Sequence, residues 1–450
     1  MCSYRLLGSV IELTTNYYLR WLRQGVLLLL SYSVMMTASA GQTYYVCDSG
    51  SDKHDGLSPE RAIQSYAKAA ELFNHRLKGG GKILFCRGGV FPIQQASPLY
   101  NPHCLHHSQS PCVLADYGLH PQRPRLLALD THGIQLQDKG TPDPDGHYQI
   151  KNLAIVSQHH RFAGIFLHNM VSHVVIDNVY IAGFATGVQE AGANKIQGNV
   201  TVGQSHITIR NSMIRDNAHY GWLGGCDHCH IINNTFVNNG FSRAIFNHNI
   251  YLTSHHGMMP QSMVIRGNTL SQSAIVDEKC QGVSLVAHGV FRNLVIEHNV
   301  ITEAVNRASP HCWGISIDPG YPREEGFYQT VIRHNHLSNV GNIAIGCASC
   351  VGLTISDNTI EDHSGQLLVA IKVPVKPEDS IKSRHIRIEN NQIVLKGKQA
   401  IGIEVEAKGP LSVNNNTITR PMTSTQACIM LGSGASVPVT ASNRCLGGAK

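Results

Sequence analysis

This sequence has few charged and few aromatic side chains. Lys, Arg, Asp and Glu make up 15% of its 450 residues and Phe, Trp and Tyr only 6%, whereas glycine occurs 42 times. Low charge and frequent glycine are typical of sheet-rich proteins with many turns and argue against a helical bundle. Beyond residue 40 there is no apolar run of the roughly 20 residues needed to cross a bilayer. We therefore predict a mature chain that spans no membrane.

The N-terminus has the layout of an export signal. Arg20 and Arg23 precede an uncharged apolar run from Gly25 to Met36, and the small residues Ala38-Ser39-Ala40 suit signal peptidase. We predict that residues 1–40 are a cleaved signal peptide. A signal anchor is the alternative, because the stretch before the first of these arginines is long. With cleavage after Ala40 as the favoured alternative, the protein is expected to be secreted or periplasmic.

The net charge is too small to indicate nucleic acid binding. Residues 1–40 hold three Arg and one Glu, which leaves 33 basic and 29 acidic residues and a charge of +4 after cleavage. A mild positive excess suits an anionic glycan instead, and 26 histidines would strengthen that attraction at acidic pH. We expect an acidic polysaccharide as partner, no nucleic acid, and a monomer.

A six-residue frame recurs along the chain. It has an apolar residue at each end and a polar pair in the middle that usually includes Asn. The first residues of successive frames are 22 to 36 positions apart, which indicates coils of fixed core and variable loops, as in a β-helical solenoid. The frames are Ile150–Ile155, Ile176–Ile181, Ile209–Ile214, Ile231–Phe236, Ile265–Leu270, Ile296–Ile301, Ile332–Leu337, Ile355–Ile360, Ile388–Ile393 and Val413–Ile418.

Each frame predicts two inward strand residues separated by a sharp bend. Asn and Gly fit the bend especially well because they tolerate left-handed backbone. Coils stack about 4.8 Å apart, so successive Asn amides are expected to form a hydrogen-bonded ladder. A second strand recurs between frames, and alternation places one column of its side chains outward. That column is expected to contain Phe166, Tyr251, Ser284, Ser316, Lys372 and Glu404.

The segment before the first frame is predicted to cap the coils. Tyr44 to Cys47 is expected to form a strand, and Ile83 to Cys86 the next one. Between them a helix is predicted from Pro59 to about Leu77, with Ser58 as its N-cap. The predicted domains are the signal peptide (1–40), an N-terminal cap region (41–145), a parallel β-helix (146–420) and a C-terminal cap (421–450).

The opening of the mature chain resembles that of secreted right-handed parallel β-helix proteins. The resemblance rests on Tyr44 to Pro59 (YYVCDSGSDKHDGLSP), on the helix after it and on Arg87 to Phe91 (RGGVF). This pectate-lyase-like superfamily includes polysaccharide lyases, uronan epimerases and uncharacterised members. The resemblance covers nearly the whole mature chain and specifies fold better than activity. It implies an all-β fold, a right-handed single-stranded parallel β-helix of about ten coils with a strand-helix-strand cap.

The twelve cysteines after residue 40 are predicted to form disulfides, since an even number in an exported chain favours pairing. Cys280 and Cys312 each precede the glycine of a second strand by two residues, so neighbouring coils bring them within bonding range. Tight bridges are expected in the two CxxC segments, which lie in the shortest coils. The pairs considered are Cys226–Cys229, Cys347–Cys350, Cys47–Cys86, Cys104–Cys112 and Cys428–Cys445, with the connectivity left open.

A zinc site is the alternative for the first CxxC segment. Cys226, His228, Cys229 and His230 have the residue types that zinc prefers. The second CxxC segment has no histidines, and an exported protein meets oxidising conditions. We therefore expect a disulfide and no metal.

A cluster of titratable side chains between Phe246 and His256 is the candidate site. β-Elimination on a uronic-acid glycan needs a base for the proton beside the carboxylate, a cation for the developing enolate and an acid for the leaving oxygen. His248 and His255 flank the outward Tyr251. The following coils add Lys279, His288, Arg292 and Asp318.

We assign roles to these residues as hypotheses. Tyr251 or His248 transfers the proton, and Lys279 or Arg292 meets the carboxylate. Substrate contacts are assigned to His255, His288 and Asp318.

Signatures of better-defined chemistries in the superfamily are missing. A calcium-dependent lyase would show clustered Asp residues, but Asp216, Asp227, Asp277 and Asp318 are dispersed. There is no adjacent Asp pair or Gly-His-Gly of the polygalacturonase type, and no Asp-Pro-His-Asp of alginate epimerases. No cofactor is predicted, and calcium stays an alternative without an Asp cluster behind it.

The predicted function is that of an exported carbohydrate-active protein. The leading hypothesis is a polysaccharide lyase or C5-epimerase acting on an anionic uronic-acid polysaccharide. The alternative is a non-catalytic glycan-binding or surface protein with the same fold. A glycoside hydrolase ranks third because the carboxylates are scattered.

Overall fold

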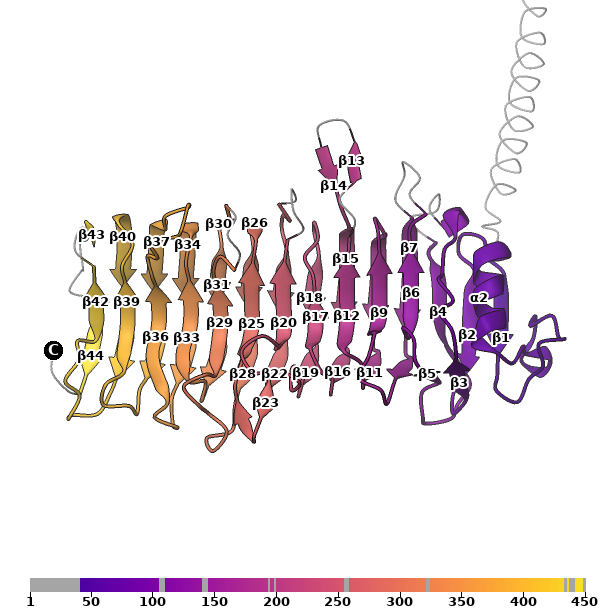
Figure 1. The fold of residues 1–450 in the computed structure, drawn as a ribbon, viewed down its shortest axis with the longest axis horizontal. Helices are drawn as coiled ribbons and strands as arrows, with labels where there is room; N and C mark the ends of the chain where they lie inside the picture. The colour runs from indigo at the N-terminus through magenta and orange to yellow at the C-terminus, as the bar shows by residue number, and fades with distance from the viewer. Residues whose placement is uncertain are drawn as a thin grey trace, which may run out of the picture. The chain divides into compact units, whose positions relative to one another are not determined.

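Parallel strands stacked coil upon coil make up nearly all of the structure (Figure 1). The computed structural model describes residues 41–104, 110–139, 145–192, 195–197, 200–254, 259–320, 324–432, 435–436 and 442–447. Gln42–Lys450 is one compact unit, and within its described residues the strands form three long parallel sheets, which we call A, B and C. The predicted parallel β-helix is confirmed. The predicted signal peptide lies outside the described residues.

The three sheets are built from the following strands. Sheet A contains β1 (Thr43–Val46), β2 (Lys82–Cys86), β4 (Cys112–Tyr117), β7 (Gly146–Lys151), β10 (Ser172–Asp177), β15 (Ser205–Arg210), β18 (His230–Ile232), β21 (Val264–Arg266), β26 (Val290–Arg292), β27 (Val295–Glu297), β30 (Gly326–Tyr328), β31 (Val331–Arg333), β34 (Cys350–Ser356), β37 (Arg384–Glu389), β40 (Gly409–Asn414) and β43 (Ala435–Ser436). Sheet B contains β3 (Val90–Ile93), β5 (Arg125–Ala128), β8 (Ala154–Val156), β11 (Tyr180–Ala182), β16 (Met213–Arg215), β19 (Thr235–Val237), β22 (Thr269–Ser271), β28 (Val300–Thr302), β32 (His336–Ser338), β35 (Thr359–Glu361), β38 (Gln392–Val394), β41 (Thr417–Thr419) and β44 (Arg444–Leu446). Sheet C contains β6 (Ile134–Gln137), β9 (Ala163–His168), β12 (Thr186–Ala191), β17 (Tyr220–Leu223), β20 (His248–Thr253), β25 (Val283–His288), β29 (Trp313–Ile317), β33 (Asn342–Cys347), β36 (Leu367–Val373), β39 (Ile401–Val405) and β42 (Ile429–Leu431).

Two short antiparallel hairpins project from these coils. One joins β13 (Lys195–Gln197) to β14 (Val200–Val202), and the other joins β23 (Ile275–Val276) to β24 (Lys279–Cys280). Both lie in the segments that vary in length between frames, as a solenoid of fixed core requires.

The recurring frame spans the bend from sheet A to sheet B. Its first apolar residue lies in sheet A, where Ile176 pairs with Ile150 on one side and Ile209 on the other. Its last apolar residue lies in sheet B, where Ile181 is paired with the equivalent isoleucines of the neighbouring coils. These side chains are fully buried. The frame therefore supplies two rows of the core, as predicted.

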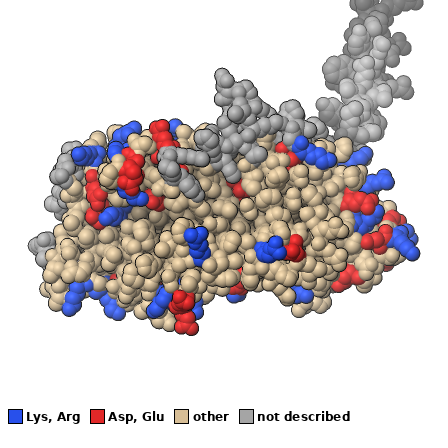
Figure 2. All heavy atoms as spheres, viewed as in Figure 1, with Lys and Arg blue, Asp and Glu red and all other residues tan. Residues whose placement is uncertain are grey.

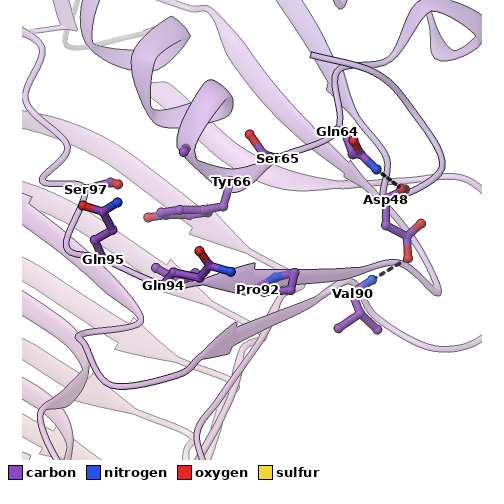
Figure 3. Close-up of a pocket in the computed structure, with 11 residues that line it drawn as sticks. Asp48, Gln64, Ser65, Tyr66, Val90, Pro92, Gln94, Gln95 and Ser97 are labelled. Atoms are coloured by element: carbon purple, nitrogen blue, oxygen red, sulfur yellow. Dashed lines mark hydrogen bonds between the residues drawn. The ribbon is translucent and has the colours of Figure 1, made fainter.

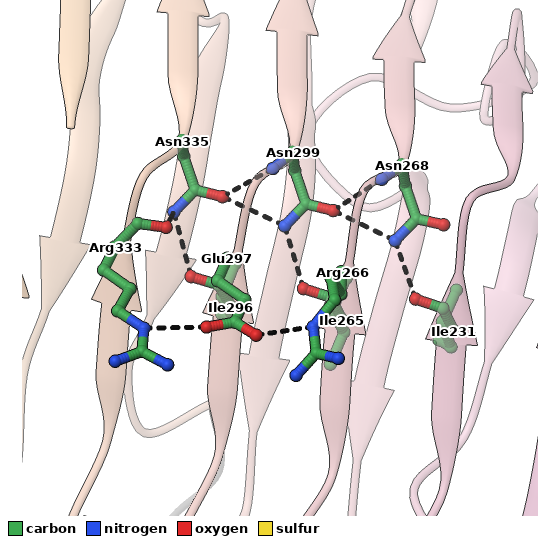
Figure 4. Close-up of polar contacts among 9 residues, drawn as sticks. All are labelled: Ile231, Ile265, Arg266, Asn268, Ile296, Glu297, Asn299, Arg333 and Asn335. Atoms are coloured by element: carbon green, nitrogen blue, oxygen red, sulfur yellow. Dashed lines mark hydrogen bonds and ion pairs between the residues drawn. The ribbon is translucent and has the colours of Figure 1, made fainter. Parts of the chain in front are cut away.

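The two middle positions of the frame have different structural roles. The first adopts left-handed backbone, as at His298 with φ 55° and Gly267 with φ 67°. The second is buried and forms the predicted ladder: Asn299 Nδ2 donates to Asn335 Oδ1 at 3.0 Å and to the carbonyl of Ile265 at 2.9 Å (Figure 4). The ladder comprises Asn234, Asn268, Asn299, Asn335, Asn358, Asn391, Asn416 and Asn443.

The helix in the N-terminal segment begins later than predicted. The helix α2 spans Tyr66–His75, and its N-cap is Ser65. Ser58 precedes only a short 3-10 turn, η1 (Pro59–Arg61), and caps nothing. The prediction was wrong because Ile63 runs extended beside β1, exchanging backbone hydrogen bonds of 2.8 and 3.0 Å with that strand. A second 3-10 turn, η2, spans Pro102–Cys104.

All six predicted disulfide pairs are present. Their Cα atoms are 5.1 to 6.2 Å apart. The zinc alternative is wrong, since Cys226 and Cys229 are bonded to each other. Six disulfides are typical of proteins that fold outside the cytoplasm. In the described part of the chain no helix has both the length and the apolar character needed to cross a bilayer.

One member of the predicted outward column was misplaced. Tyr251 pairs with Val286, which pairs with Ser316, whereas Ser284 is fully buried. The sequence analysis aligned Gly282 with Gly314 of the next coil. The strand register instead places Ser284 opposite Gly314. A small residue is needed there because a Cβ on Gly314 would lie 2.4 Å from a backbone oxygen of the next coil.

Candidate functional site

A pocket of about 770 Å³ opens on the outer face of sheet C. Strands β17, β20 and β25 supply its floor, and the segment 242–247 supplies a wall. Tyr251 and His288 point outward because alternate residues of a strand lie on opposite faces, whereas Tyr220 and His248 line the pocket from the first residues of β17 and β20. The pocket is lined by His219, Tyr220, Ser242, Arg243, Ile245, Phe246, Asn247, His248, Tyr251, His288 and Gly320.

Aromatic rings surround Tyr251 at the centre of the pocket. Its ring centroid is 5.4 Å from Tyr220, 5.6 Å from His248 and 5.5 Å from His288. The two imidazoles meet the Tyr251 ring edge to face, at 85° and 89°. Tyr220 and His248 are paired in register on adjacent coils. Aromatic faces beside hydroxyl and imidazole groups combine an apolar surface with directional hydrogen bonds, which suits a sugar ring.

His248 is a neutral group in this pocket. Its ring is 4% exposed, and its Nδ1 accepts a hydrogen bond from the backbone N–H of Val283 at 3.3 Å. Burial, aided by the nearby His288, lowers the pKa of His248 from 6.5 to about 3. The neutral ring therefore carries its proton on Nε2. At neutral pH His248 is suited to donate a hydrogen bond rather than to act as a base.

Arg243 gives the pocket its positive charge. Its guanidinium lies over the ring of Phe246, 3.9 Å from the centroid, and Phe246 is 54% exposed. Among the residues that line the pocket in the described part of the chain, no Asp or Glu occurs. The pocket can thus accept an anionic group, and its lining lacks the carboxylate pair of glycoside hydrolases.

Asp318 supports His288 from the edge of the pocket. His288 Nδ1 lies 2.6 Å from the backbone oxygen of Asp318. The Asp318 carboxylate pairs with Lys376 Nζ at 3.0 Å and accepts a hydrogen bond from Ser316 Oγ at 3.2 Å. Because a carbonyl oxygen only accepts, Nδ1 of His288 carries a proton, so a lone pair on this ring can lie only on Nε2.

The predicted site residues therefore divide into two groups. His248, Tyr251 and His288 come together, with Asp318 beside them. Lys279 lies in the β23–β24 hairpin and donates to the carbonyl of Asn306 at 2.7 Å. Arg292 lies in β26 of sheet A, with its guanidinium 5.5 Å from the ring centroid of Tyr328. His255 is outside the described residues.

Only His248, Tyr251 and His288 among the lining residues were predicted as site residues from the sequence. Tyr220 had a usable signal, because Gly221 occupies the small-residue position that Asn249 holds in the next coil. Arg243 and Phe246 lie in a loop between frames, where no periodicity places a side chain. Because no pattern placed Arg243 at the site, the sequence analysis assigned the role of the cation to Lys279 or Arg292.

A second hollow, of about 580 Å³, lies between α2 and β3 near the N-terminal end of the coils (Figure 3). Asp48 uses its carboxylate to accept from the backbone N–H of Val90 at 2.9 Å, and its carbonyl accepts from Gln64 Nε2 at 3.1 Å. The ring of Tyr66 lies across the hollow (Figure 3). Asp48 and Gln64 thus hold the surrounding loops together, and the pocket on sheet C remains the candidate site.

Two groups in the described residues have the spacing of metal ligands. They are Cys47, Asp48 and Cys86, and Cys280, Glu303 and Cys312. Each contains a disulfide. Metals bind cysteine as thiolate, so neither group is a metal site in the oxidised protein.

Comparison with known proteins identifies the fold. The family model for the right handed beta helix region matches residues 323–443. The complex structure of XylC with xylose is 10% identical, with a TM-score of 0.56, and the match covers 90% of this chain and 86% of that chain. This chain is a right-handed parallel β-helix protein.

Two further solved structures share the β-helix. The catalytic unit of the GH87 α-1,3-glucanase from Streptomyces thermodiastaticus strain HF3-3 is 14% identical, with a TM-score of 0.53, over 82% of this chain and 62% of that chain. The Dettilon tailspike protein is 12% identical, with a TM-score of 0.51, over 90% of this chain and 68% of that chain. No curated protein matches this β-helix protein. At such identities the likeness concerns the fold alone.

Proposed function

We propose that this β-helix protein binds an acidic polysaccharide on sheet C and removes the C5 proton of a uronic acid residue, leading to β-elimination or C5 epimerisation. The observation that carries the proposal is the grouping of Tyr251 and His288 with Arg243 in one pocket. The β-helix neighbours named for xylose and for α-1,3-glucan give further support for a carbohydrate ligand.

The chemistry begins with binding of the uronate carboxylate. Arg243 faces the pocket and is suited to pair with the carboxylate and to stabilise the charge that grows on it as the enolate forms. Asn247, also in the lining, adds an amide to the same wall. Arg243 thus replaces Lys279 and Arg292 in the role that the sequence analysis gave to them.

Proton transfer falls to His288 and Tyr251. The C5–H bond breaks as His288 Nε2 takes the proton, while its Nδ1–H stays bonded to the backbone oxygen of Asp318. In elimination the C4–O4 bond then breaks, a C4=C5 double bond forms, and the Tyr251 hydroxyl protonates O4. In epimerisation the C4–O4 bond stays intact, and the Tyr251 hydroxyl instead donates its proton to C5 on the face opposite His288. His248 positions the substrate by a hydrogen bond, because its lowered pKa keeps it neutral.

Tyr251→Phe tests the proposal. Removing a general acid typically lowers the rate by about 10²–10⁴-fold, while the aromatic ring that contacts the sugar remains. Turnover is measured by the ultraviolet absorbance of unsaturated product on pectate, alginate and glycosaminoglycans, and by exchange of the C5 proton with solvent. The matched control is Tyr328→Phe on sheet A, which should leave turnover unchanged.

A non-catalytic glycan-binding protein is the second candidate. The observation that favours it is the small number of titratable groups left for catalysis, since His248 is neutral and Asp318 is paired with Lys376. If the unaltered protein binds these polymers but yields neither unsaturated product nor proton exchange, the catalytic proposal fails and the binding function stands.

A further inference from the structure

Four histidines form a stack on sheet A, away from the pocket. The rings of His147, His173, His206 and His228 lie face to face, with centroids 4.5, 4.5 and 5.1 Å apart and ring planes within 14° of parallel. They come from β7, β10 and β15 and from the residues just before β18 (Figure 1). We call these four residues the histidine row.

The backbone fixes the row in place. Each of the four histidines has φ between 52° and 57°, the left-handed region that turns its side chain out of the strand. The residues just before them are paired in parallel register, Ser172 with its neighbours on β7 and β15, so the rings repeat once per coil. His147 is half-buried and the other three are exposed. The row thus presents imidazole edges along the direction in which the coils stack.

Charging the row is unfavourable unless an anion is present. Two unit charges about 4 Å apart repel by roughly 1 kcal/mol in water and 4 kcal/mol at the lower effective dielectric of a protein surface. Burial lowers the pKa of His147, and burial together with both neighbouring histidines lowers that of His173. His147 and His173 therefore bind a proton less readily than an ordinary imidazole does.

The groups beside the row do not neutralise it. His230 adjoins its end, and its own pKa is lowered by burial, by Arg266 and by His228. Asp227 precedes His228, and its carboxylate, which accepts from the backbone N–H of Gln261 at 2.8 Å, carries a single negative charge beside the four imidazoles. Protons taken up at acidic pH therefore add positive charge that a bound anion would relieve.

We propose that the histidine row is a second binding site, which takes a linear acidic polysaccharide as the pH becomes acidic. The repeat of one ring per coil, about 4.8 Å, favours a polymer with charges along its length over a single small anion. Outside the cytoplasm, where six disulfides indicate that the protein folds, acidic glycans are linear polyanions of this kind. Binding and proton uptake are then coupled, so each favours the other.

The test uses the full chain with polygalacturonate as the probe and uncharged dextran as the comparison. A His173→Asn/His206→Asn variant removes two charges from the middle of the row, and Asn keeps the left-handed backbone. We expect this variant to bind polygalacturonate about tenfold more weakly at about pH 5 and equally well at about pH 8, since imidazoles titrate in between. The matched control is His298→Asn/His334→Asn, another exposed pair stacked at 4.8 Å, which should bind like the unaltered protein.

Further arms separate this site from the pocket on sheet C. Arg243→Gln should weaken polymer binding at both pH values and leave the acid-dependent component intact, whether or not the protein proves catalytic. Unfolding midpoints show that each variant is folded. The proposal is overturned if polygalacturonate binds with the same affinity at both pH values, if the row variant matches the control, if monomeric galacturonate competes as well as the polymer, or if DNA binds more tightly than the glycan.

Discussion

The buried Asn ladder and the outer column of sheet C both repeat once per coil, but they differ in their chemistry. Inside, the same residue recurs at the ladder position because each amide satisfies the next. In the outer column the residues in register differ from coil to coil, and adjacent members pair only locally, as Lys372 and Glu404 do at 3.0 Å. In the ladder, repetition of one side chain therefore follows from a structural requirement, whereas the outer column of sheet C can vary from coil to coil. The outer column reads Phe166, Gln189, Leu223, Tyr251, Val286, Ser316, Gly346, Lys372 and Glu404.

Interrupting the buried Asn ladder should have the largest effect on the free energy of unfolding. Asn299→Ala removes the acceptor of the backbone N–H of Asn268 and the donor to the carbonyl of Ile265, both buried. Leaving a buried polar group unpaired costs about 1–3 kcal/mol each, so we expect a loss of about 4 kcal/mol in the free energy of unfolding. Denaturant titration measures it.

The outer column supplies the control for that change. Gln189→Ala should alter the unfolding free energy by less than about 0.5 kcal/mol, as most surface substitutions do. Equal losses in the two variants would show that the buried ladder is no more important to stability than the outer face. A small loss in Asn299→Ala alone would mean that water or a shifted neighbour replaces the amide.

The first coils show that Asn is not the only solution to the bend. Leu153 and Val179 occupy the ladder position there and are fully buried. Ser212 joins Val179 to the ladder, since its Oγ accepts from the backbone N–H of Val179 and its own backbone N–H donates to Asn234. The first position of the bend keeps its left-handed residue throughout, as at Asn178 with φ 54°. The first position of the bend thus requires left-handed backbone in every coil, whereas the hydrogen bonds required at the second position depend on the groups that the next coil offers.

A buried carboxyl at the turn next to sheet C offers a second comparison, because its effect depends on pH. Glu303 is 1% exposed, and its Oε1 accepts from the backbone N–H of Ser273 at 2.9 Å. Burial raises the pKa of Glu303 from 4.5 to about 7. Between these values the native protein holds a proton that the unfolded chain has lost, so stability falls as the pH rises through this window.

Glu303→Gln should remove that dependence. The variant is expected to match the unaltered protein below about pH 4.5 and to exceed its unfolding free energy by about 3 kcal/mol above pH 7, at 1.36 kcal/mol per pKa unit. The measurement is the unfolding free energy of both proteins across this range. Parallel curves would show that Glu303 ionises as readily in the native state as in the unfolded chain.

The sequence predicted the features that recur from coil to coil, but not the side chains that loops of variable length contribute. The frame gave the strands, the inward isoleucines and the Asn ladder, and equivalent positions in the coils gave Cys280–Cys312. Arg243 could not be placed, because a loop of variable length has no period. Ser284 was misaligned because two small residues, at 282 and 284, both matched the glycine of the next coil. The grouping of Tyr251, His248 and His288 was predictable because strand register fixes it.

Ion pairs that join successive coils of sheet A offer a third comparison, between the buried ladder and contacts at the surface. The Glu297 carboxylate lies between Arg266 and Arg333, at 2.5 and 2.7 Å, on the same bends as the ladder (Figure 4). Burial alone would raise the pKa of Glu297, but the two guanidinium groups outweigh it and lower that pKa. Any stabilisation is therefore present above the ordinary pKa of 4.5 and lost as the pH falls below it.

Arg333→Gln should have the smallest effect of the three changes. The Arg333 side chain is 47% exposed, and Arg266 still pairs with Glu297 after the substitution. Exposed ion pairs contribute about 0–1 kcal/mol, and salt screens them, so we expect a loss below about 1 kcal/mol that shrinks further at high ionic strength. Arg387→Gln, which breaks a more exposed pair with Glu389, is the matched control. A loss as large as that of Asn299→Ala would mean that Glu297 depends on both arginines to remain charged at its buried position.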